Sequence, residues 1–513
     1  MADCWDIAFR DELSRSDRNT VFTLRDTRNR WAHNSKFDLD EAYRALDSIE
    51  VLLKSIDASE GDIVGESKDE LMRLRYAAEA KSTGKQEVLV AVPTAGMRPW
   101  REVIIPHDDV SHGRFNQAEF AADLWQVQSG RGRAEYIDPV EFFRRTFLTA
   151  GLRTLLTEAA QRLTTTGGVP VVDLQTNFGG GKTHSQIALW HLFSGTPIES
   201  FPDEVRSLLA EAGVSALPPA RRAVLVGTKV SPGQVSGKSD GTETRTMWGE
   251  MAWQLGGADG YAIVAEADRT ATNPGEALNR LLEAYAPCLI LVDEWVAYAR
   301  QLSDTRVDLV GGGFDTQFTF AQALTEAARA VPGALLVVSL PASEGTGEAG
   351  IGSDIEVGGA GGREALRKLR NVVGRMESSW RPATAEESFE IVRRRLFRPI
   401  DPSSEADRDN TARVFGDLYR KEASEFPNEC REPAYVERIK AAYPIHPELF
   451  ARLYEDWSTL DRFQLTRGVL RLMATVIHAL WEAGDQSPLI LPSSIPLAAA
   501  AVSAELTRNL DDQ

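Results

Sequence analysis

The sequence predicts an α/β fold in which a parallel sheet is flanked by helices, with a helical segment before it and an α-helical lid after it. Four short apolar runs support this prediction, and stretches with helical spacing separate them. Continuous apolar runs are typical of strands that helices cover on both faces, as in parallel sheets. A chain of 513 residues is long enough for several domains. The apolar runs comprise residues 169–174, 222–227, 287–293 and 333–340.

The composition is that of a soluble globular protein, with 43% apolar and 26% charged residues. The net charge of -18 disfavours the whole chain as a non-specific binder of nucleic acid, so that role would need a local basic groove. The three cysteines form neither a disulfide framework nor a zinc pattern, which fits a reducing compartment. No apolar run approaches the roughly 20 residues of a membrane span, and the N-terminus lacks a signal-peptide core. We therefore expect a cytoplasmic protein without a membrane partner.

Residues 1–60 are predicted to be helical, and they contain Arg28 and His33. An arginine followed by a histidine after a few residues is the mark of HEPN domains, many of which are metal-free ribonucleases. The stretch RNRWAHN followed by FDLDEAYRALDSIEVLL resembles the Swt-type HEPN subfamily. This resemblance implies that His33 would act as the base for a ribose 2′-OH and Arg28 as the cation for the scissile phosphate. The alternative is a structural or dimerising HEPN segment without activity.

Geometry links the catalytic alternative to dimerisation. Residues five apart lie about 140° apart around an ideal helix, so Arg28 and His33 would not share one regular face. HEPN domains are understood to complete the site by pairing two protomers, so an active pair implies a HEPN-mediated dimer.

Residues 61–98 are predicted to be a linker or small connector, because charged residues, Gly and Ser interrupt any long pattern there.

Residues 99–383 are predicted to form the α/β core. Its first segment, residues 100–107, is expected to be extended, and residues 107–112 are expected to form a solvated loop rather than a metal site. Asp138 is predicted to cap a helix whose first residue is Pro139, because Asp is favoured at the N-cap and Pro at the next position.

A glycine-rich break lies between the strand predicted at residues 169–174 and a helix that begins at Lys182. Glycines let backbone N–H groups turn inward around phosphate oxygens, and the helix adds the positive end of its dipole. Lys182 would reach the β- and γ-phosphates of ATP, and the Thr183 hydroxyl would ligate Mg²⁺. The predicted loop residues that bind nucleotide are Thr176, Asn177, Phe178, Gly179, Gly180, Gly181, Lys182, Thr183 and His184.

This loop departs from the usual phosphate-loop pattern GxxxxGK[ST] at one position, because Thr176 stands where the pattern has its first glycine. The GGGKT core, the preceding strand and the following helix are as the pattern requires. The alternative is a glycine-rich turn that binds no nucleotide.

The apolar run 287–293 ends in two carboxylates, Asp293 and Glu294, which is the Walker B form. Asp293 would hold the Mg²⁺ shell, and Glu294 would orient and deprotonate the attacking water. The alternative is a strand that ends in an acidic helix cap. Ser339, near the end of the run 333–340, stands where AAA+ proteins place a polar residue near the γ-phosphate.

The C-terminal part, residues 384–513, is predicted to be a helical lid, from which Arg467 would contact phosphate. Arg375 and Arg381 are candidates for an arginine finger that reaches the γ-phosphate of a neighbouring subunit, which would require an oligomer. The alternative for each arginine is a surface ion pair.

Residues 99–509 resemble a family of large bacterial AAA+-type P-loop ATPases of antiphage defence loci, similar to protein Y of the phage-growth-limitation system. The motifs that support this resemblance are PWREVIIPHDDV, GRFNQAEFAADLWQV, EYIDPVEFFRRTFLT, VVDLQTNFGGGKTHS, TMWGEMAWQLGG, LILVDEWVAYAR, YPIHPELF and RFQLTRGVLRLMATVIHALW. The resemblance implies ATP and Mg²⁺ binding, with Lys182, Thr183, Asp293 and Glu294 at matching positions. It also implies a methyltransferase or other defence proteins as partners. Family members usually extend further, so the chain is expected to be short at both ends.

We therefore expect a Mg²⁺-dependent ATPase that serves as the motor or switch of a bacterial antiphage defence system. Three alternatives remain open from the sequence. The ATPase would gate a HEPN ribonuclease toxin, or the chain would be a nucleotide-dependent scaffold without significant turnover, or it would be a DNA translocase with a basic channel.

Overall fold

The computed structural model describes residues 20–21, 24–25, 27–28, 39–54, 64–65, 67–68, 96–114, 123–164, 167–176, 181–303, 309–341, 359–373, 378–379, 385–455 and 465–507. The chain divides into two compact units, Met1–Val92 and Pro93–Gln513. Within the described residues, no helix is both long enough and apolar enough to cross a membrane.

The described part of the first unit is helical, as the sequence predicts. Its longest element is α2 (Leu39–Lys54). Arg28 also has helical backbone and an exposed side chain. Val21 and Leu52 are buried, with 5% and 7% of their surfaces exposed. His33 lies outside the described residues, so the predicted pair of Arg28 and His33 has no geometry here.

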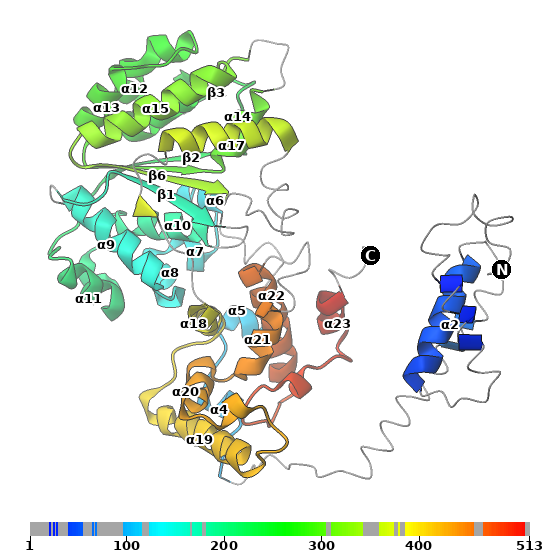
Figure 1. The fold of residues 1–513 in the computed structure, drawn as a ribbon. Helices are drawn as coiled ribbons and strands as arrows, with labels where there is room; N and C mark the ends of the chain where they lie inside the picture. The colour runs from blue at the N-terminus through cyan, green and yellow to red at the C-terminus, as the bar shows by residue number, and fades with distance from the viewer. Residues whose placement is uncertain are drawn as a thin grey trace, which may run out of the picture. The chain divides into compact units, whose positions relative to one another are not determined.

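The second unit contains a sheet between layers of helices (Figure 1). Its strands are parallel, and their order among the described residues is β2-β5-β6-β1-β7. The predicted apolar runs form four of these strands, so the α/β prediction with a parallel sheet is confirmed. The last strand is short, and its two described residues pair with Val172 and Asp173. The strands are β1 (Val171–Thr176), β2 (Arg221–Val226), β5 (Cys288–Asp293), β6 (Ala334–Pro341) and β7 (Ser378–Ser379).

Helices cover both faces of this sheet (Figure 1). Alternate strand residues enter two separate apolar cores. For example, Leu289 and Leu291 pack in one core, whereas Ile290 and Val292 pack in the other. This alternation follows from the two-residue period of a strand. One layer contains α6 (Leu124–Gln128), α7 (Ala134–Ile137), α8 (Pro139–Arg145), α9 (Ala150–Thr164), α10 (Lys182–Leu192) and α11 (Asp203–Glu211). The other contains α12 (Met247–Arg269), α13 (Ala277–Tyr285), α14 (Trp295–Gln301), α15 (Phe314–Ala330) and α17 (Gly359–Val373).

A small antiparallel hairpin, β3 (Ser236–Gly237) and β4 (Glu243–Thr244), follows β2. On the other side of the sheet, the predicted cap of α8 is confirmed, because the Asp138 side chain accepts a hydrogen bond of 2.7 Å from the Glu141 N–H.

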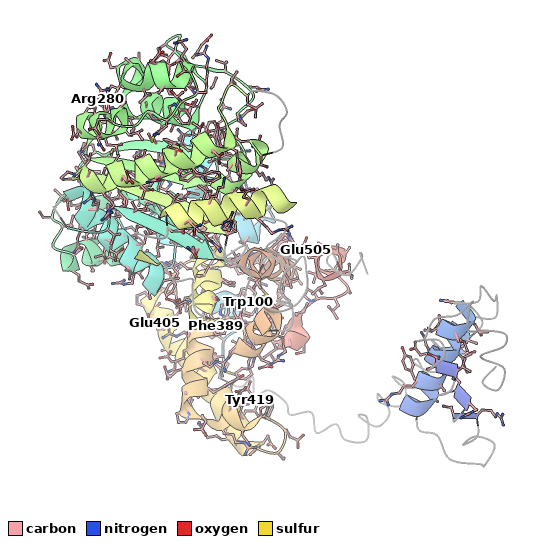
Figure 2. All side chains as sticks on the ribbon, turned by 45° about the horizontal axis from the view of Figure 1, so that its top comes forward. Trp100, Arg280, Phe389, Glu405, Tyr419 and Glu505 are labelled. Atoms are coloured by element: carbon pink, nitrogen blue, oxygen red, sulfur yellow. The ribbon has the colours of Figure 1, made fainter. Side chains whose placement is uncertain are left out.

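The C-terminal part is helical, as predicted, and its helix α18 borders the sheet layers next to α8 (Figure 1). Phe389 of α18, which is labelled in Figure 2, packs against Phe450 with ring centroids 4.8 Å apart. The helices are α18 (Ala385–Leu396), α19 (Glu405–Lys421), α20 (Pro433–Ala442), α21 (Pro447–Glu455), α22 (Leu465–Glu482) and α23 (Ala500–Thr507).

The segment 96–114 differs from its predicted form and packs against these C-terminal helices. Instead of an extended stretch and a solvated loop, it contains two short helices, α4 (Trp100–Val103) and α5 (Asp108–Ser111). Trp100 is fully buried, and its Nε1 donates a 2.8 Å hydrogen bond to Asp485. Its ring also contacts Phe397 and Trp481. Burial against distant residues therefore decided the local conformation, which the sequence pattern alone did not reveal.

Candidate functional site

The predicted glycine loop begins after β1 and ends at α10, so the strand and helix expected around it are confirmed. Gly181 precedes α10 with a φ of 87°, and a Cβ added there would meet nothing within 4 Å. Glycine suits this position because L side chains rarely adopt a positive φ. Residues 177–180 lie outside the described part of the chain, as does the side chain of Thr176. Lys182 is half-buried in the first turn of α10.

Three predicted site residues from distant parts of the sequence meet at the carboxyl edge of the sheet. The Thr183 hydroxyl donates a hydrogen bond of 2.9 Å to Oδ2 of Asp293. The Ser339 hydroxyl donates to Oδ1 of the same carboxylate. Asp293 and Ser339 are buried, with 4% and 2% of their surfaces exposed. The Asp293 carboxylate therefore links the first turn of α10 to the end of β6.

Strand order and side-chain alternation explain this meeting. β6 lies between β1 and β5, and Ser339 is the register partner of Leu174. Leu289 and Leu291 point into the core that contains α10. Asp293 is two residues further along the same strand, so it points to the same side. The helix after β1 covers one face, whereas the helices after β5 and β6 cover the other. In open parallel sheets, ligands bind at the carboxyl ends of the strands where the connections change face in this way.

Glu294 has a left-handed backbone, with φ 54° and ψ 37°, directly after β5. This conformation is uncommon for a residue other than glycine, and such residues cluster at active sites. The Glu294 N–H lies 3.1 Å from Oδ1 of Asp293 and 3.3 Å from Oγ of Ser339, so both can accept its hydrogen bond. The backbone of Glu294 is therefore attached to the same cluster as Thr183.

Two residues at the end of β2 contact Asp293 and Glu294, and the sequence reasoning missed both. The Thr228 hydroxyl donates a 2.5 Å hydrogen bond to Oε2 of Glu294. The N–H of Gly227 donates to the Asp293 carbonyl at 2.8 Å. A Cβ on Gly227 would lie only 2.1 Å from the Glu294 carbonyl oxygen. Gly227 ends the predicted run 222–227 and Thr228 follows it, and this position was a usable signal because the ends of parallel strands share one edge.

His184, a predicted nucleotide-binding residue, packs against helix α8 and the residue that follows it. Its ring lies 4.7 Å from the Phe142 ring, and its Nε2 lies 3.0 Å from the Thr146 hydroxyl. That hydroxyl already donates its proton to the Phe142 carbonyl, so it accepts from the His184 Nε2–H. Burial lowers the pKa of His184 to about 4 and keeps the ring neutral.

The side chains of three other predicted site residues lie outside the described part of the structure. Arg467 lies in α22, but its side chain is outside the described part of the structure. Arg375 and Arg381 also lie outside it, so the arginine-finger predictions stay predictions. Among the described residues, no three His, Cys, Asp or Glu side chains form a metal cluster. The adjacent oxygens of Thr183 and Asp293 are nevertheless of the type that Mg²⁺ takes alongside phosphate oxygens and water.

Comparison with known families gives three matches along the chain. The model of the DUF499 N-terminal domain matches residues 101–379, which is more than half of the chain. The model of the DUF499 second domain matches residues 383–513, and the Swt1-like HEPN model matches residues 1–57. A search of curated proteins and a search of solved structures found no match.

Proposed function

This chain belongs to the DUF499 family, and from that premise we propose that its α/β unit is a Mg²⁺-dependent ATPase. We further propose that it serves as the motor or switch of a bacterial antiphage defence system, because DUF499 is associated with defence loci. The observation that carries the proposal is the contact of Thr183 and Ser339 with Asp293 at the carboxyl edge of the sheet. In the sequence, a buried strand and a glycine loop come directly before Lys182 and Thr183, which is the order that a phosphate-binding loop requires.

Each residue has a defined role in the proposed reaction. The loop N–H groups and Lys182 would hold the β- and γ-phosphates, and the α10 N-terminus would add favourable dipole charge. Thr183 and Asp293 would hold Mg²⁺, which neutralises charge on the phosphate oxygens when bound. Glu294 would accept a proton from the attacking water as the bond between the γ-phosphorus and the bridging oxygen breaks. The products are ADP and inorganic phosphate.

Phosphate release from ATP tests this proposal directly. The purified chain with Mg²⁺ is compared with Lys182→Ala and Glu294→Gln. We expect Lys182→Ala to lose ATP binding and turnover, because its ammonium group no longer meets the phosphates. We expect Glu294→Gln to bind ATP but release phosphate at least about 100-fold more slowly. Undiminished release by Lys182→Ala would reject the assignment, whereas tight binding without turnover in the wild type would favour the scaffold alternative.

A second function is a HEPN ribonuclease, which the Swt1-like HEPN match at residues 1–57 favours. In this proposal His33 is the base and Arg28 is the cation, and two protomers complete the site, because HEPN domains often dimerise. The test is RNA cleavage by the full chain in the presence of EDTA, with and without ATP. Cleavage should disappear in His33→Ala, and cleavage that survives this replacement would contradict the proposal.

A further inference from the structure

A group of largely buried charges joins the sheet layers to the C-terminal helices. The two oxygens of Asp109, on α5, accept from two different arginines: Arg145 at 3.1 Å and Arg395 at 3.3 Å. Arg395, on α18, also pairs with Glu135 at 3.2 Å. The exposed fraction of these four side chains is 15% or less. We call Asp109, Glu135, Arg145 and Arg395 the Asp109 cluster.

The Asp109 cluster connects three parts of the fold. Glu135 and Arg145 lie on α7 and at the end of α8, in the layer that covers β1. Asp109 lies in the segment 96–114, which packs on the C-terminal helices. Arg395 lies on α18, within the part that matches the DUF499 second domain. The backbone adds to this connection, because the His107 N–H donates to the Leu396 carbonyl at 2.9 Å.

Helix α10 contacts α7 and the C-terminal end of α8. His184 and His191 are seven residues apart and therefore lie on one face of α10. The Nε2 of His191 donates a 2.7 Å hydrogen bond to the Tyr136 carbonyl, and that of His184 donates to Thr146. The Phe142 ring packs against both histidine rings, with its centroid 4.7 Å from that of His184 and 5.1 Å from that of His191.

The two residues that accept hydrogen bonds from these histidines, Tyr136 and Thr146, are each next to a member of the Asp109 cluster. Tyr136 follows Glu135 in the chain, and Thr146 follows Arg145. A displacement of α10 therefore moves Glu135 and Arg145 together. Buried carboxylate–guanidinium pairs cannot separate cheaply, because each unpaired charge would remain out of water. Asp109 and Arg395 must then follow the movement instead of absorbing it.

We propose that the Asp109 cluster couples nucleotide binding at the N-terminus of α10 to the position of α18 and the second domain. The inference rests on the proposed function, because it takes ATP as the ligand that displaces the first turn of α10. Thr183 begins the pathway at Asp293, and His184 and His191 continue it to α7 and α8. Arg395 ends the pathway on α18, which packs against α20 and α22.

Amide hydrogen exchange in α18 tests this coupling. The probe is a non-hydrolysable ATP analogue with Mg²⁺, added at saturating concentration to the full chain. In the wild type we expect the analogue to change the exchange rate of α18 amides by about fivefold or more, the lower end of typical coupling. In Asp109→Asn the analogue should still bind, but exchange in α18 should no longer respond. Because coupling is reciprocal, the affinity of Asp109→Asn for the analogue should differ from that of the wild type by the same factor.

Asp108→Asn is the matched control. Asp108 is the neighbour of Asp109 on α5, but its ion pair with Arg398 is largely exposed, with 71% and 49% of the two side chains accessible. This variant should respond to the analogue as the wild type does. If Asp109→Asn does not fold, Thr146→Val carries the test, because it removes the hydroxyl that accepts from His184 and donates to the Phe142 carbonyl but nearly keeps the side-chain volume.

The possible outcomes separate the two proposals. A wild type that binds the analogue without any change in α18 exchange overturns the coupling and leaves the ATPase proposal intact. An Asp109→Asn variant that responds like the wild type overturns it equally. A wild type that does not bind the analogue overturns the proposed function itself.

Discussion

Replacing Gly227 by alanine should displace Glu294 without touching any residue that holds the phosphates. Gly227 follows β2, and its backbone lies directly against the Glu294 carbonyl. An added Cβ would lie 2.1 Å from that oxygen, 2.9 Å from the carbonyl carbon and 3.0 Å from the Tyr298 nitrogen. All three contacts are with backbone atoms, so rotation of a side chain cannot relieve them.

The size of the effect follows from these distances. Ordinary contact between such atoms needs about 3.5 Å, so the Glu294 carbonyl oxygen, only 2.1 Å from the added Cβ, must move by roughly 1.4 Å. Overpacking of this kind costs about 1–3 kcal/mol of folding free energy. A misplacement of about 1 Å at a reacting group costs roughly 100-fold in rate. We therefore expect Gly227→Ala to bind Mg²⁺ and ATP normally but to release phosphate about 100-fold more slowly.

The assay combines phosphate release, ATP binding and urea unfolding for the wild type, Gly227→Ala and Gly237→Ala. Gly237 in β3 is the matched control, because a Cβ there would meet nothing within 4 Å. Its replacement should leave all three measurements unchanged. If Gly227→Ala retains turnover within about twofold of the wild type, the backbone position of Glu294 does not control the reaction.

Three further replacements probe the site and the stability of the fold. Thr228→Val should lower kcat about tenfold with little change in KM, because Glu294 loses a charge-assisted hydrogen bond; an unchanged kcat would exclude this positioning role. Arg162→Met should lower the free energy of unfolding by about 2–4 kcal/mol, measured in urea, because the buried guanidinium donates three hydrogen bonds of 2.8–2.9 Å to backbone carbonyls; a loss under about 0.5 kcal/mol would contradict this. Burial lowers the pKa of His191 from 6.5 to about 4, so the unfolded chain binds a proton first and stability should fall as the pH falls through this range. His191→Gln keeps a donor for the Tyr136 carbonyl and should flatten that part of the pH profile, whereas an unchanged slope would assign it to other groups.

The periodic and local features of this protein could be predicted from its sequence. Apolar runs located the main strands within a few residues, because burial on both faces leaves a continuous pattern. The cap formed by Asp138 and Pro139 was equally accessible, since capping depends on neighbouring residues alone. The glycine loop before Lys182 and the carboxylates Asp293 and Glu294 were recognisable as candidates, because their chemistry requires particular residue types directly after a strand.

Tertiary structure alone decided which of these residues meet. A strand pattern indicates burial but not the neighbouring strand, and only the order that places β6 between β1 and β5 brings Ser339 to Asp293. The role of Thr228 is hidden for the same reason, because its partner Glu294 is on another strand end. Arg395 reads in the sequence as one of three consecutive arginines on a helix. Its burial between Asp109 and Glu135 depends on packing between segments that are hundreds of residues apart.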